Sequence, residues 1–236
     1  LGMLEEAHQL RLLIYEALTV LPKDNGVRIV AANNLGTTFS FKGEYREAEK
    51  FHLEALEGYR LNNKTQGEEG FIYTAGLLNH LGKDSYFQEK HDEAETYYLK
   101  ALEADPESYS ALTNMGDLRL VQDSQSEAEK FYIEALKVCR RVEGNESLER
   151  LGIISALGRL FKNQGKFDEA ERYHQEVFEY YRQRFGKEHV NTITYLQEIG
   201  RLRDAEGKLD QAELIYRDCL ERRVNSDDSL ISDTFK

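Results

Sequence analysis

Tryptophan is absent from this chain of 236 residues, and proline and cysteine occur only twice each. With so few prolines, long helices can form without the residue that most often interrupts them. Of the two cysteines, Cys139 and Cys219, the second stands where other repeats have a small packing alanine; nothing indicates a disulfide framework, which favours a reducing compartment. No apolar run is long enough to cross a bilayer, and no secretory leader is recognisable. We therefore expect a cytoplasmic protein without a membrane partner.

The motifs of common enzyme sites are missing as well. The sequence contains no Gly-x4-Gly-Lys-Ser/Thr loop, no His-Glu-x-x-His, no Cys-x-x-Cys and no Gly-x-Ser-x-Gly. Forty-three acidic against 31 basic residues give a net charge of −12, which argues against a nucleic-acid binder that acts through backbone phosphates. We expect no catalytic residues, no metal, no cofactor and no nucleic-acid partner, and hence no enzyme.

What the sequence does contain is a glycine followed twelve residues later by an alanine, five times over. The pairs are Gly36 with Ala48, Gly82 with Ala94, Gly116 with Ala128, Gly158 with Ala170, and Gly200 with Ala212. Each alanine is followed by a glutamate, which places acid near the start of a helix, where the helix dipole favours it. Small residues at this spacing let two helices approach closely, so the pattern predicts helical hairpins that must stack to bury their apolar faces.

Other positions keep the same phase along one face of each helix. An apolar residue precedes every glycine, a ring follows every alanine by four residues, and a small residue follows it by seven. The rings are His52, Tyr98, Tyr132, His174 and Tyr216. Glycine ends the first helix in three hairpins, at Gly43, Gly165 and Gly207. The second and third hairpins lack this glycine, so we expect their turns to be less tightly specified.

Leu-Gly in one helix and Ala-x3-aromatic in the next resembles the tetratricopeptide repeat. The alanines are mostly 41 to 46 residues apart, which is similar to the long repeats of kinesin light chain. Three stretches carry that likeness: Asn33-Asn34-Leu35-Gly36, the turn from Lys162 to Glu171, and the connection Gly186 to Thr192. Ser85, Arg119 and Arg203 depart from it, because they stand where the family has an aromatic residue. The resemblance implies an all-α fold, a right-handed α-solenoid of helix-turn-helix repeats.

The repeat register also divides the chain. We expect residues 1–25 to be a partial repeat that consists of its second helix, residues 26–223 to be five hairpins, and residues 224–236 to be a polar tail or the start of a further repeat. Asn225 to Ser229 resembles a connection between units. Both ends fall within repeats, so we expect the chain to be part of a larger protein.

In such an array the first helices line a concave groove, and fixed positions around each glycine face it. The candidate peptide-binding residues are Asn33, Asn34, Thr37, Phe41, Asn79, His80, Lys83, Phe87, Asn114, Arg159, Asn163 and Arg201. Asparagine amides suit a peptide backbone, the cationic side chains suit carboxylates, and Phe41 with Phe87 suit an apolar anchor. His80, without a carboxylate or cysteine at ligand spacing, is expected to be a hydrogen-bonding contact rather than a metal ligand.

These residues predict a non-enzymatic scaffold or adaptor that binds a protein or peptide, acidic and with an apolar anchor. The alternative is a regulatory sensor region of a multidomain signalling ATPase, in which the array packs against its own neighbouring domains. A nucleotide-binding module or a coiled coil in the flanking sequence would distinguish the two.

Overall fold

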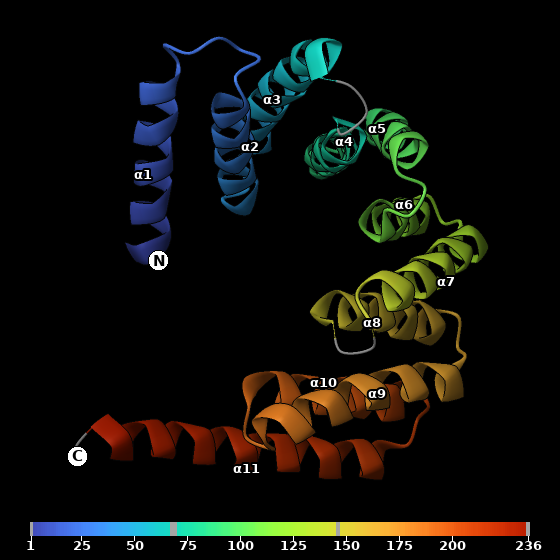
Figure 1. Cartoon of the computed structure of the whole chain (residues 1–236). Coiled ribbons are helices and arrows are strands. Elements are labelled where there is room, and N and C mark those ends of the chain that lie inside the picture. The colour runs from blue at the N-terminus through green and yellow to red at the C-terminus, as the bar shows by residue number, and fades with distance from the viewer. Residues whose placement is uncertain (1, 67–69, 145–146, 235–236) are drawn as a thin grey trace. The chain divides into compact units, whose positions relative to one another are not determined.

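The computed structural model describes residues 2–66, 70–144 and 147–234, which form eleven helices and no strand (Figure 1). They belong to two compact units, Leu1–Val138 and Cys139–Lys236. The first unit contains α1 (Gly2–Leu18), α2 (Gly26–Phe41), α3 (Tyr45–Gln66), α4 (Gly70–Phe87), α5 (His91–Ala104), α6 (Tyr109–Val121) and most of α7 (Gln125–Val142). The second contains the end of α7 and α8 (Leu148–Asn163), α9 (Phe167–Phe185), α10 (Val190–Ala205) and α11 (Leu209–Thr234). Within the described residues, no helix is both long and apolar enough to cross a membrane.

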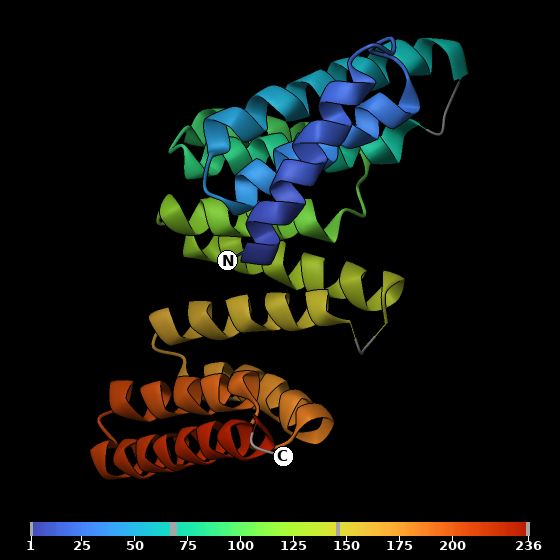
Figure 2. The same cartoon turned by 90° about the vertical axis from the view of Figure 1, so that its left-hand side faces the viewer.

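Neighbouring helices pair as the repeat predicts. Helices α2 and α3, α4 and α5, α8 and α9, and α10 and α11 pack as hairpins, and α1 lies against α2 (Figure 2). The second helix of one hairpin packs on the first helix of the next in the pairs α3 with α4, α5 with α6, and α9 with α10. The all-α solenoid fold expected from the sequence is thus confirmed.

The hairpins cross where each repeat glycine meets a ring. A Cβ atom added to Gly82 would lie 2.4 Å from the ring of Tyr98, and one on Gly158 would lie 2.8 Å from His174. The same clash arises at Gly36, Gly116 and Gly200, each against the ring four residues after the repeat alanine. The five repeat alanines are themselves buried. The predicted register is therefore correct at every repeat.

All five hairpin turns close in the same way, which corrects the expectation of two looser turns. Glu89 and Asp123, seven residues after their repeat glycines, take the left-handed conformation at φ 62° and 56°, as Gly43 does at 78°. The amide of the following residue then bonds back to the helix, for example Lys90 N to Ser85 O at 2.9 Å and Ser124 N to Arg119 O at 2.8 Å. Because side chains disfavour this conformation, these two turns keep the geometry at a cost in backbone strain.

Two of the glutamates that follow the repeat alanines have a second role that the sequence did not reveal. Glu95 on α5 accepts two hydrogen bonds from Arg119 on α6, at 2.5 and 3.1 Å, and Glu171 on α9 pairs with Arg203 on α10. Both arginines stand where the family has an aromatic residue. The departure from the family pattern is therefore compensated by an ion pair between successive hairpins.

The end of the chain differs from expectation. Helix α11 continues to Thr234, so the break expected between Asn225 and Ser229 is absent. No glycine or proline follows Gly207 to stop the helix. The helix α2 begins at Gly26, where the Asn25 side chain caps it. The division into residues 1–25, 26–223 and 224–236 otherwise stays a prediction.

Replacing Glu89 with glycine should stabilise the protein. The substitution removes the strain of a left-handed non-glycine residue, about 1–2 kcal/mol, and loses part of that gain to the greater freedom of glycine in the unfolded chain. We expect a net gain of roughly 0.5–1 kcal/mol in urea unfolding. Asp123→Gly should gain less, because aspartate tolerates this conformation better. Lys100→Gly, within α5, is the matched control and should destabilise; an equal loss in Glu89→Gly would contradict the strain at Glu89.

Candidate functional site

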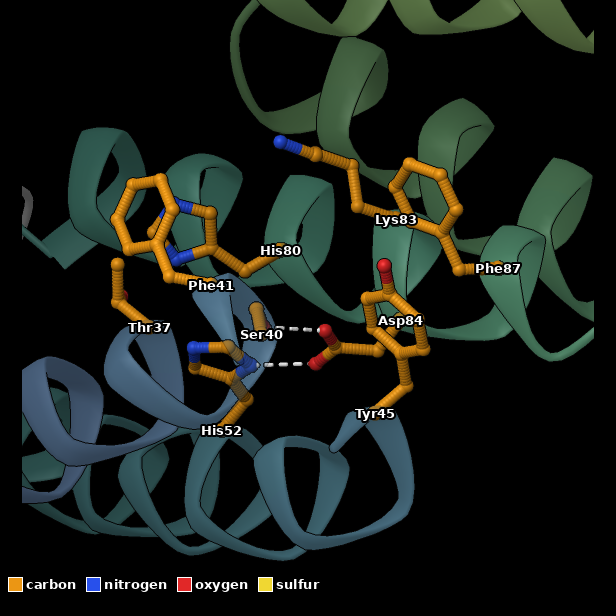
Figure 3. A pocket seen from close by; sticks show the side chains of 9 residues that line it. All are labelled: Thr37, Ser40, Phe41, Tyr45, His52, His80, Lys83, Asp84 and Phe87. Atoms are coloured by element: carbon orange, nitrogen blue, oxygen red, sulfur yellow. Dashed lines mark hydrogen bonds and ion pairs between the residues drawn. The ribbon is translucent and has the colours of Figure 1, made fainter. Parts of the chain in front are cut away.

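The first unit contains a small cavity between its first two hairpins (Figure 3). The cavity has a volume of about 140 Å³ and lies among α2, α3 and α4. Its lining residues are Thr37, Ser40, Phe41, Tyr45, His52, His80, Lys83, Asp84 and Phe87. A cavity of about 150 Å³ admits a benzene-sized molecule, whereas pockets for whole cofactors are several times larger. This cavity therefore has room for one side chain.

Five of the predicted groove residues meet at this cavity: Thr37, Phe41, His80, Lys83 and Phe87. They come from two hairpins, as the register required. The four other lining residues were not among the predicted site residues. His52 had been assigned to helix packing alone, and nothing in the repeat pattern singles out Ser40, Tyr45 or Asp84.

A buried carboxylate organises the base of the cavity. Asp84 on α4 is 1% exposed. Its Oδ1 accepts a hydrogen bond from Ser40 Oγ on α2 at 2.6 Å, and its Oδ2 lies 2.6 Å from His52 Nδ1 on α3 (Figure 3). The three side chains tie the first hairpin to the second. Because the aspartate lies between the serine and the histidine, the imidazole is not placed to take the serine proton, and Ser40 is not activated as a nucleophile.

His80 is less isolated than its sequence context suggested. Its ring centroid is 5.0 Å from that of His52, which in turn contacts Asp84. Nδ1 of His80 lies 3.2 Å from Oδ1 of Asn33 on the preceding first helix. Burial lowers the pKa of His80 to about 4, and the nearby His52 and Lys83 act in the same direction. His80 is therefore neutral at pH 7. No cluster of three or more histidine, cysteine or acidic side chains suited to a metal occurs in the described part of the chain.

The cavity has aromatic walls that reach into solvent. Phe41 is 76% exposed and Phe87 is 50% exposed. The Phe87 ring stacks on Tyr45, with centroids 4.8 Å apart and planes 11° apart. Phe87 is thus held in place by a residue of α3, while half of its surface stays exposed.

The predicted asparagines fall into two groups. Asn114 Nδ2 donates to Asn79 Oδ1 at 2.7 Å, and Asn33 bonds His80, so both pairs link successive first helices. We call these two pairs the rungs. The sequence placed these residues on one face but did not show that they are close enough to bond one another. Asn34, in contrast, is exposed on α2.

The three remaining candidates belong to the second unit. Arg159 and Asn163 lie on α8 and Arg201 on α10, and all three are exposed. Arg201 pairs with Glu198 one turn earlier in its own helix. The part of these residues in binding stays a prediction, as it does for the residues of the first unit.

Unfolding should become easier as the pH falls from 6.5 towards 4. Burial lowers the pKa of His174 to about 4, as it does for His80, from an ordinary value of 6.5. The unfolded chain binds protons at these sites in a window where the folded chain does not, so the free energy of unfolding should drop by roughly 2 kcal/mol per histidine by pH 5. His174→Tyr introduces the tyrosine that three other repeats have at this position. In this variant the contribution of His174 to the fall in the free energy of unfolding should be absent, as measured by urea unfolding at each pH. NMR titration midpoints near 6.5 for both rings would contradict the assignment.

Sequence and structure comparisons agree on the kind of repeat. Two models of the tetratricopeptide repeat match the chain, one at residues 107–183 and 149–223 and the other at 28–61 and 74–104, well over half of its length together. No curated protein matches the sequence.

Several solved structures share the fold. BtubC (BKLC) from P. vanneervenii is 18% identical, with a TM-score of 0.79 over 95% of this chain and 92% of that one. A Podosopora anserina putative kinesin light chain with nearly identical TPR-like repeats is 13% identical, with a TM-score of 0.68 over 84% of this chain and 96% of that one. MamA is 16% identical, with a TM-score of 0.57 over 85% and 94%. At such identities the likeness concerns the fold alone.

Proposed function

We propose that this chain, which belongs to the tetratricopeptide repeat family of protein-interaction modules, holds a peptide or partner helix along the first helices of its hairpins. It would act as an adaptor or scaffold within a larger protein. The observation that supports this most directly is the cavity between the first two hairpins, where five independently predicted groove residues meet.

The cavity favours one inserted side chain as the anchor of the complex. Burying an apolar side chain is worth about 1.5–3 kcal/mol. The exposed faces of Phe41 and Phe87 offer the surface for it, and the bonds around Asp84 keep the base in one arrangement. An anchor that enters a preformed site loses little free energy to reorganisation of the protein.

Charged side chains contribute less to the proposed binding than the anchor does. Lys83 at the cavity and the exposed Arg159 and Arg201 in the second unit are the proposed partners of acidic residues in the peptide. Exposed ion pairs contribute about 0–1 kcal/mol and are screened by salt. Acidic residues of the partner would therefore steer association, while the anchor would set the lifetime of the complex.

The peptide backbone is assigned to Asn34 rather than to the rungs. Asn34 is exposed, whereas Asn114 and Asn33 already bond Asn79 and His80. An occupant supplied by a neighbouring domain of the same protein, as in a regulatory sensor, would use the same groove.

A peptide selection tests the groove directly. Phage-displayed random peptides are selected on the immobilised chain, and the enriched peptides are then measured against Phe41→Ala/Phe87→Ala by calorimetry. We expect a loss of at least about tenfold in affinity, because the double variant removes the walls of the anchor site. Leu99→Ala/Ile133→Ala is the matched control, since it removes two apolar side chains of 46% and 47% exposure from second helices. It should leave affinity unchanged.

If the selected peptides bind Phe41→Ala/Phe87→Ala as tightly as the wild type but bind Leu99→Ala/Ile133→Ala more weakly, the binding surface lies on the second helices instead. Failure to enrich any peptide would also count against the proposal, provided that circular dichroism shows the same helix content in all three proteins.

The cationic residues are tested with the same peptides. Arg159→Glu/Arg201→Glu should slow association and weaken its dependence on salt, with little change in dissociation. Stopped-flow measurements at two salt concentrations report both rates. An unchanged association rate would show that the peptide does not reach the second unit.

A further inference from the structure

The hydrogen-bond donors at the base of the cavity are already used by the protein. Thr37 Oγ1 donates to the Asn33 carbonyl at 2.9 Å. The Ser40 hydroxyl and the His52 Nδ1 both face Asp84 at 2.6 Å. A group that enters the cavity therefore meets acceptors, and not donors, at its base.

His80 adds a further hydrogen-bond acceptor, because the tautomer of its ring is defined. Oδ1 of Asn33 can only accept, so Nδ1 of His80 carries the proton of their hydrogen bond. The ring is neutral at pH 7, because burial lowers the pKa of His80 to about 4. Nε2 then has a free lone pair, and among the described residues nothing bonds to it.

Lys83 supplies a donor next to this acceptor. His80 and Lys83 lie one turn apart on α4, and the Lys83 side chain extends away from the Phe87 ring toward the side where His80 and Phe41 lie (Figure 3). Lys83 carries an ammonium group, and Tyr45, behind Phe87, carries a phenol hydroxyl. The cavity thus presents a hydrogen-bond acceptor, His80 Nε2, and a donor, Lys83 Nζ, from neighbouring turns of one helix, with Phe41 and Phe87 beside them.

A group that is donor at one end and acceptor at the other fits this arrangement. We propose that the cavity binds a primary amide, the side chain of a glutamine or asparagine in the bound peptide, whose NH2 group donates to His80 Nε2 and whose carbonyl accepts from Lys83 Nζ. This inference rests on the proposed function and changes one part of it: the anchor is not wholly apolar but has an amide at its tip, and only its methylene stem contacts Phe41 and Phe87.

A carboxylate of the same shape does not fit. It would set an acceptor against the His80 lone pair and a negative charge beside the buried Asp84. Lys83 is then used by the amide carbonyl, and the acidic residues expected in a partner lie outside the cavity, beside the exposed Arg159 and Arg201. The site should therefore bind a glutamine side chain and reject a glutamate side chain.

Three small molecules of nearly equal shape test the proposal on the intact chain. Propionamide has both a donor and an acceptor, butanone keeps only the acceptor, and propionate adds a charge. NMR of the protein labelled with ¹⁵N at histidine reports the tautomer of His80 and any hydrogen bond to Nε2. We expect a protonated Nδ1 at pH 7, and a shift of the Nε2 signal with propionamide that is absent with the other two. Propionamide should bind about tenfold more tightly than either, since each of the others leaves a polar group unpaired.

His80→Phe keeps a ring in place but removes Nε2, and should abolish the preference for propionamide. His91→Phe, a histidine in the same unit outside the cavity, is the control and should keep it. Equal binding of propionate, a proton on Nε2, or an unchanged preference in His80→Phe would each overturn the proposal. The tautomer and the shift are read from the wild-type protein, so they decide the question even if His80→Phe fails to fold.

The test of the amide site can fail or succeed independently of the test of peptide binding. Selected peptides that bind the groove but accept glutamate as readily as glutamine would refute the amide site and leave the peptide-binding function standing. Propionamide binding with no peptide enriched would support the amide site and refute the peptide groove.

Discussion

The contact between a glycine and a ring is the constraint on which this structure depends. At each of the five hairpins the backbone of the first helix lies so close to an imidazole or phenol ring that no Cβ atom would fit between them. Protein interiors are packed too densely for such a contact to be widened without loss. The crossing therefore fixes how far each second helix lies from the first, and so which residues of the first helix stay free to face the groove.

In the first hairpin the same contact also forms part of the candidate site. His52 packs against Gly36 with one edge and bonds the buried Asp84 of the next hairpin with the other. A buried carboxylate is costly unless it is bonded, and losing one partner leaves it uncompensated. Packing within one hairpin and attachment to the next are thus joined in a single side chain, which explains why the cavity above it has a defined polar base.

The first and second helices of the hairpins have different roles in the array. Second helices carry the repeat alanines and the glutamates that follow them, and two of those glutamates pair with arginines of the next hairpin. These two glutamates of the second helices therefore have a stacking function. First helices carry the rungs and the cavity, where amides, a neutral imidazole and phenylalanine rings predominate.

The sequence by itself determined the fold, the helix pairing and the register, because each follows from a local period: a residue either repeats in phase with the glycine or it does not. It also placed Thr37, Phe41, His80, Lys83 and Phe87 on one face. Only the tertiary structure decided that Asp84 bonds Ser40 and His52, that Asn79 bonds Asn114, and that Glu89 adopts a conformation typical of glycine. The first two are contacts between different hairpins, and the third is the geometry of a turn that closes without glycine. A repeat period gives the direction in which a side chain points, but the distance to its neighbour depends on how closely the hairpins pack.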